Sequence, residues 1–235
     1  NDLTNSILSL VSDHPRQLES KVMPAPRSDA PSADAEPFIL LRYTAMLDEA
    51  GVTQFASQLR YVADGLSTEA AELSGKEADT LFAAADEKYR AAIALKPDDH
   101  EILTNWGNAL ADQAKQKRGQ VADDLFSEAG RKYQAAIVLK QGADKAFFNW
   151  GVALHDQARN KAGAAAETIL SESGRKYEAA LNLNPNNHQA LNSWGNALAD
   201  QANWKAGDEA DSLLAEANQK YHAALAIKPD KFEAL

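Results

Sequence analysis

The sequence predicts an all-α protein in which antiparallel helix pairs stack side by side as an α-solenoid. Two observations lead to this fold class. Three residue patterns recur with a constant step of 44 residues (Lys88 to Lys132, for example), and apolar residues within each step follow helical spacing. A fixed period of this size is typical of repeat proteins, whose units bury apolar faces against each other. The patterns are Lys88-Tyr89, Lys132-Tyr133, Lys176-Tyr177 and Lys220-Tyr221; Trp106-Gly107, Trp150-Gly151 and Trp194-Gly195; and Gly75, Gly119, Gly163 and Gly207.

Each unit contains two segments with helical periodicity. In the unit 98–141, Leu103, Trp106 and Leu110 are three and four residues apart and share one helix face. A second segment follows up to Leu139, and Gly119 lies between the two, where the chain has to turn. Because proline cannot continue a helix, it ends the second segment of a unit. The prolines at these ends are Pro97, Pro185 and Pro229. We expect the Trp and Tyr ladders to pack in the core.

The repeats divide the chain into seven segments. We expect 1–36 to be a flexible Pro-rich N-terminal segment, 37–52 a capping helix closed by Gly51, and 53–97 a degenerate repeat in which Val62-Ala63 replaces Trp-Gly. Three full repeats follow at 98–141, 142–185 and 186–229, and 230–235 begins a further helix or forms a cap. An alternative for 1–36 is a partner-binding arm anchored by a short apolar run, Ile7 to Val11.

The repeat resembles the tetratricopeptide repeat (TPR) family. Its first motif is matched by Leu103, Trp106-Gly107 and Leu110, and its second by Ala129, Tyr133 and Ala136. The resemblance implies a right-handed TPR-like superhelix in which the first helices of the repeats line a concave groove. One repeat has Gln141 where the others have the closing proline. Each unit is also about ten residues longer than the family's 34, which predicts one taller edge of unknown role.

Composition and motifs exclude several functions. The formal net charge is -10, from 24 Lys+Arg and 34 Asp+Glu, and an acidic chain is a poor partner for nucleic acid or an anionic membrane. The chain has no cysteine, and no apolar run approaches the 18 residues that membrane insertion needs. None of the five histidines belongs to an H-E-x-x-H or H-x-x-x-H motif, and no phosphate-binding loop is present. We therefore expect no enzyme activity, no cofactor and no metal.

The resemblance implies that protein or peptide segments bind in the groove. Asp112, Asp156 and Asp200 recur there and favour a basic or polar segment, with contacts between neighbouring first helices as the alternative role of these carboxylates. Phe148, Val152 and His155 form an irregular, partly apolar patch in the same row. The candidate binding residues are Asn108, Asp112, Phe148, Asn149, Val152, His155, Asp156, Asn192, Asn196 and Asp200. Trp204 is a candidate contact at the lengthened edge, or it packs on a neighbouring helix.

Three functions follow from this interpretation. The first is a non-catalytic protein–protein interaction scaffold, or a structural subunit of a larger multiprotein complex. The second is an organellar import receptor or a chaperone-like adaptor. The third is the regulatory TPR array of an enzyme whose catalytic part lies outside this sequence. The first residue is Asn rather than Met, and we expect an intracellular protein while leaving open a processed organellar one.

Overall fold

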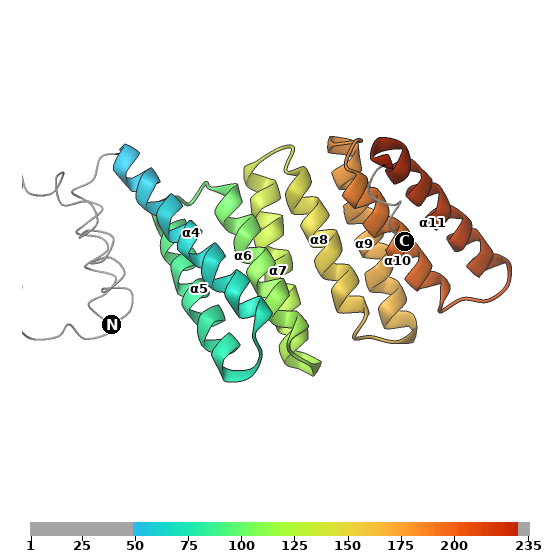
Figure 1. Ribbon diagram of the computed structural model, residues 1–235, viewed down its shortest axis with the longest axis horizontal. Coiled ribbons are helices and arrows are strands. Elements are labelled where there is room, and N and C mark those ends of the chain that lie inside the picture. Colours follow the sequence, from blue (N-terminus) through green and yellow to red (C-terminus); the bar gives the residue numbers. More distant parts are fainter. Residues whose placement is uncertain (1–48, 230–235) are drawn as a thin grey trace, which may run out of the picture. The chain divides into compact units, whose positions relative to one another are not determined.

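The computed structural model describes residues 49–229, and all regular structure in this range is helical (Figure 1). The chain falls into two compact units, Asn1–Gln58 and Leu59–Leu235, of which the second carries the features below. The helices are α4 (Glu49–Glu72), α5 (Gly75–Leu95), α6 (His100–Lys115), α7 (Gly119–Leu139), α8 (Asp144–Ala158), α9 (Gly163–Leu183), α10 (His188–Ala202) and α11 (Asp208–Ile227). The expectations for 1–36, for most of 37–52 and for 230–235 concern residues outside this range.

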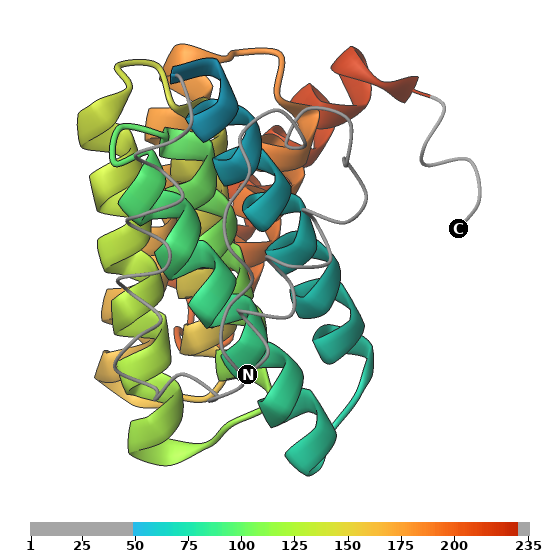
Figure 2. The ribbon, with the colours of Figure 1, turned by 90° about the vertical axis from the view of Figure 1, so that its left-hand side faces the viewer.

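The helices pack as pairs that follow each other along the chain. Helix α6 packs on α7, α8 on α9 and α10 on α11, while α7 contacts α8 and α9 contacts α10. The shorter helices α6, α8 and α10 also contact one another in order. Figure 1 shows α5 to α11 side by side in chain order, and Figure 2 views the same row from the α4 end. The all-α fold class is confirmed, and the pairwise packing is that of an α-solenoid.

Local sequence explains where the helices begin. The Asp99 carboxylate accepts hydrogen bonds from the backbone N–H groups of Glu101 and Ile102 at the start of α6, and Asn187 caps α10 in the same way. Glycines with positive φ stand at or immediately before the start of α5, α7, α9 and α11, where other residues would be strained. They are Gly75, Gly119, Gly163 and Gly207, the ladder found in the sequence.

The core contains the tyrosine ladder, as expected for three of its members. Tyr89, Tyr133 and Tyr177 are at most 1% exposed. Tyr221, on α11, is only half-buried. The tryptophans differ in the same way, because Trp106 is 4% exposed whereas Trp150 and Trp194 are half-buried. Burial in the core is therefore most complete in the earlier units.

Two sequence-based boundaries need comment. The predicted end of a capping helix at Gly51 is wrong, because α4 continues through Gly51 from Glu49 to Glu72. A helical conformation is open to glycine, so its presence alone does not end a helix. The missing proline at Gln141 does not extend α7, which ends at Leu139, because Gly142 turns the chain with a φ of 98°.

Candidate protein-binding surface

The candidate residues lie on the row formed by α6, α8 and α10, which we call the first-helix face. Asn108 and Asp112 lie on α6; Phe148, Asn149, Val152, His155 and Asp156 on α8; and Asn192, Asn196 and Asp200 on α10. Since these three helices contact one another, the residues are brought into one row. Trp204 lies apart from them, in the turn after α10.

Two candidate asparagines accept hydrogen bonds from residues of the tyrosine ladder. The Tyr133 hydroxyl donates to Asn108 Oδ1 at 2.8 Å, and the Tyr221 hydroxyl donates to Asn196 Oδ1 at 2.8 Å. Each bond joins the two helices of one pair. Burial raises the pKa of Tyr133 well above its ordinary value, with Asp112 and Asp156 adding to the shift, so its hydroxyl stays protonated as a donor. These asparagines therefore serve the pairing of helices, and only part of their hydrogen-bonding capacity remains for a ligand.

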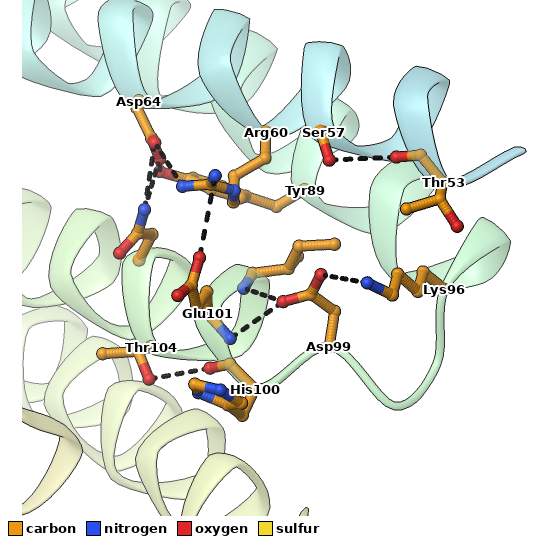
Figure 3. A network of polar contacts seen from close by, with 12 residues as sticks. Thr53, Ser57, Arg60, Asp64, Tyr89, Lys96, Asp99, His100, Glu101 and Thr104 are labelled. Atoms are coloured by element: carbon orange, nitrogen blue, oxygen red, sulfur yellow. Dashed lines mark hydrogen bonds and ion pairs between the residues drawn. The ribbon is translucent and has the colours of Figure 1, made fainter. Parts of the chain in front are cut away.

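A carboxylate takes the same place on α4, as Figure 3 shows. Asp64 accepts from the Tyr89 hydroxyl at 2.6 Å and pairs with Arg60 at 3.5 Å. Asn105 on α6 donates to both oxygens of Asp64, and Arg60 approaches Glu101 at 3.7 Å. This network joins α4, α5 and α6 through hydrogen bonds between side chains, some of them with a charged partner, which are stronger than neutral ones.

Val152 stands where the other units have a side chain that accepts a hydrogen bond from a tyrosine hydroxyl. It occupies the position of Asp64, Asn108 and Asn196, packs against the cluster that contains Tyr177, and has no polar atom to offer. The Tyr177 hydroxyl is buried and makes no hydrogen bond to any residue of the described range 49–229. Burial raises the pKa of Tyr177 above its ordinary value. A buried hydroxyl without a partner costs free energy, so this position is a weak point of the stack.

Removing the two hydroxyls should therefore have different effects. We expect Tyr133→Phe to lower the free energy of unfolding by about 0.5–1.5 kcal/mol, because it removes a made hydrogen bond. Tyr177→Phe should leave stability unchanged or raise it, because it removes an unpaired polar atom. Urea denaturation of both variants checks this difference, and equal losses would contradict it.

The carboxylates of the row contact basic side chains on their own helix or on the neighbouring first helix. Asp112 contacts Lys115 at 2.5 Å, and Lys115 reaches Asp156 on the next first helix at 4.0 Å. Asp200 contacts His155 Nε2 at 2.7 Å and Arg159 at 3.9 Å, both across the α8–α10 boundary. Contacts between neighbouring first helices are the alternative role that the sequence left open for these carboxylates. They reduce the negative charge available to a basic ligand.

Four further candidate residues of the first-helix face are apolar or form no side-chain hydrogen bond within residues 49–229, and a fifth, His155, is buried. Phe148 and Val152 are half-buried and pack on the Tyr177 cluster, with the Phe148 and Tyr177 ring centroids 6.1 Å apart. His155 is only 6% exposed, so it is held inside the stack rather than presented to a ligand. The Asn149 and Asn192 side chains are half-buried and form no hydrogen bond within residues 49–229. The two apolar side chains and these two amides form the part of the row best suited to bind a ligand.

Sequence reasoning missed a set of lysines at the lengthened edge. Lysines after the first helices pair with acidic side chains on the preceding long helix, as Lys161 does with Asp123 at 2.6 Å and Lys205 with Glu167 at 2.7 Å. Lys117 pairs with Asp79 in the same way. The 44-residue step of these lysines was visible in the sequence, but their partners were not. Trp204, next to Lys205, is 48% exposed.

A cavity of about 250 Å³ lies elsewhere, between α9, α10 and α11. Gly174, Trp194 and Leu213 are among its lining residues, and no candidate residue of the first-helix face is. It is smaller than the roughly 300–1,000 Å³ of typical ligand pockets. Within residues 49–229 no group of acidic or histidine side chains could hold a metal ion, and no helix has the length and apolar character to cross a bilayer.

The contacts above describe an all-helical, repeat-like protein with a polar and partly apolar helix face and a structural ladder of ion pairs. Residues 167–235 match the family described as plant specific mitochondrial import receptor subunit TOM20. The match covers less than a third of the 235 residues and includes most of α9 and all of α10 and α11. No curated protein matches the chain.

Proposed function

We propose that this protein is a non-catalytic receptor that binds targeting segments of other proteins, of the kind that mitochondrial import receptors recognise. The match of residues 167–235 to an import receptor family carries this proposal. The matched stretch contains three candidate residues of the first-helix face, Asn192, Asn196 and Asp200. A receptor of this kind needs a binding surface and no catalytic group, which agrees with the absence of a catalytic motif in the sequence.

We further propose that the array consists of TPR-like repeats lengthened to 44 residues, at 98–141, 142–185 and 186–229. Support comes from α7 and α9, which have the same length of 21 residues and both begin at a glycine of positive φ. The lengthened edge carries the lysine pairs, so the extra residues would add one ion pair to each interface between units. Such half-exposed pairs contribute little each, but they fix the register of neighbouring helices.

The targeting segment would bind on the first-helix face around α8. Phe148 and Val152 offer apolar surface, and the amides of Asn149 and Asn192 can bond to a peptide backbone. The chain as a whole is acidic, with a net charge of -10, so a segment with an apolar side and basic residues fits it best. This chemistry is that of an amphipathic helix in a helix-lined groove.

Blocking this face should weaken peptide binding without unfolding the protein. We expect Asn149→Arg combined with Asn192→Arg to weaken binding of a basic amphipathic peptide at least about tenfold. The new side chains fill the face and repel the cationic ligand, while no hydrogen bond of the stack is lost. The measurement is fluorescence anisotropy of a labelled 20-residue peptide at low and high salt.

The matched control is Gln134→Arg combined with Asn182→Arg, which adds the same charge at exposed positions of α7 and α9. This control should bind the peptide as the wild-type protein does. If the wild type fails to bind any basic amphipathic peptide, the receptor function is wrong. If both double variants lose affinity equally, the first-helix face is not the binding site.

A scaffold or complex subunit is the second proposal. It is favoured by a separate surface on α11, where Leu214 is 44% exposed while its counterparts Phe82, Phe126 and Leu170 are at most 5% exposed.

A further inference from the structure

Helices α5, α7 and α9 each contact the next short helix through the same two positions. The first position is acidic and pairs with a lysine: Asp123 on α7 pairs with Lys161, and Glu167 on α9 with Lys205. The second position lies seven residues later and contacts a tryptophan. On α5 it is Asp86, which accepts from Trp106 Nε1 at 2.8 Å.

Glycine stands at the second position on α7 and α9. A Cβ atom at Gly130 would lie 3.2 Å from Trp150 Nε1, and one at Gly174 would lie 3.1 Å from Trp194 Nε1. The tryptophan of each incoming short helix therefore packs directly on the long helix of the preceding unit. An apolar residue between the two positions is covered by the same contact, since Phe82, Phe126 and Leu170 are only 4%, 5% and 4% exposed.

Helix α11 repeats these positions, and no short helix within residues 49–229 packs on them. Asp211 takes the acidic position, Leu214 the apolar one and Asn218 the one that faces tryptophan, each 44 residues after its counterpart on α9. Leu214 is 44% exposed, and Asp211 and Asn218 are exposed. The side chains of Asp211 and Asn218 form no hydrogen bond and no ion pair within residues 49–229. We call these three residues and Tyr221, which is half-buried, the α11 flank.

We propose that the α11 flank is a docking surface for a helix of a partner protein. The partner helix resembles the chain's own short helices: it carries an aromatic residue that packs beside Leu214 on Asn218, and a lysine that pairs with Asp211. The three internal examples fix the spacing, because Trp106, Trp150 and Trp194 each precede their lysine by eleven residues. In every example the lysine lies just beyond the end of the short helix.

Charge selects this partner over a second copy of the chain. The first turn of α11 holds Asp208, Glu209 and Asp211. Two such flanks placed face to face would bring carboxylates against carboxylates, and like charges across an interface are costly. A helix that ends in lysine instead gains an opposite charge at Asp211. This inference goes beyond the proposed receptor function and does not depend on it.

The test uses the 235-residue protein and a labelled peptide with the sequence of residues 187–207, which carries Trp194 and Lys205. We expect saturable one-to-one binding, measured by fluorescence anisotropy. Leu214→Gln should weaken it at least about tenfold. Leu183→Gln, at a leucine of similar exposure (46%), should change it less than about twofold. Circular dichroism checks that both variants stay helical.

A charge swap tests the lysine contact independently. Asp211→Lys should weaken binding of the wild-type peptide about two- to fivefold. A peptide with Lys205→Glu should bind the Asp211→Lys variant better than the wild-type protein. Asp208→Lys makes the same charge change on the same turn and should not distinguish the two peptides.

Several results would overturn the proposal. The wild-type protein could fail to bind the peptide, or the two leucine variants could weaken binding equally. Self-association that is lost in Leu214→Gln would make a second copy the occupant. A gain of about tenfold or more in affinity after truncation at Pro229 would make residues 230–235 of the chain itself the occupant.

Discussion

Trp106→Ala is expected to lower the free energy of unfolding by about 3–5 kcal/mol, the usual cost of truncating a buried tryptophan. Trp106 is 4% exposed, and its Nε1 donates to Asp86 at 2.8 Å. Its ring stacks on Tyr89 with centroids 6.3 Å apart, and Lys132 Nζ lies 3.5 Å from its centroid. The substitution removes contacts to two neighbouring helices, α5 and α7, and leaves a cavity that rigid neighbours cannot fill.

Trp204→Ala is the matched control, because Trp204 is 48% exposed in a turn. Its loss should change stability by less than about 1 kcal/mol. Urea denaturation followed by circular dichroism compares the two variants. If Trp106→Ala were no more costly than Trp204→Ala, the tryptophan ladder would not hold neighbouring units together.

The fold could be predicted from the sequence because the residues that define the helix pairs recur at a constant step. Three ladders with one step and helical spacing within each step define paired helices without any knowledge of contacts. The positive-φ glycines recur for the same reason, since each turn between helices of a pair needs the same backbone conformation. The helix end predicted at Gly51 failed because it depended on one residue rather than on a repeated pattern.

The roles of single polar residues could be predicted only in part. Asn108 and Asn196 were assigned to a ligand from their position, but each accepts a tyrosine hydroxyl 25 residues further along the chain. Asp200 was ambiguous between ligand and neighbour, and it contacts His155 on the adjacent first helix. Which partner a carboxylate or an amide selects depends on how helices are rotated and offset, and spacing along the chain does not contain that information.

The ion pairs of the lengthened edge and the exposure of the α11 flank could not be predicted from the sequence for the same reason. The lysine ladder could be seen in the sequence, but its acidic partners lie 38 residues earlier on another helix. Leu214 has the same character as the buried Leu170 one step earlier, and only the packing shows that it is uncovered. The proposed docking surface therefore depends on a difference in burial between equivalent positions. Only the three-dimensional structure shows this difference.

Gly151→Ala is expected to lower the free energy of unfolding by about 1–3 kcal/mol, although alanine favours helices more than glycine does. A Cβ atom at Gly151 would lie 2.7 Å from Cδ1 and Cε1 of Tyr177. The Tyr177 ring is fully buried, and the Ser173 hydroxyl fixes the backbone by donating to the Gly151 carbonyl at 2.7 Å. Neither side of the contact can move without disturbing the core of the α8–α9 pair.

Two further glycines turn this expectation into a graded test. Gly195→Ala should cost less than Gly151→Ala, because its contact Tyr221 is half-buried on α11 and can swing outward. Gly65→Ala should raise stability by about 0.5–1 kcal/mol, because no atom lies within 4 Å of the added methyl group and only helix propensity acts. Thermal and urea denaturation of the three variants measures the order. A loss at Gly65 as large as that at Gly151 would contradict the tyrosine contact as the cause of the destabilisation at Gly151.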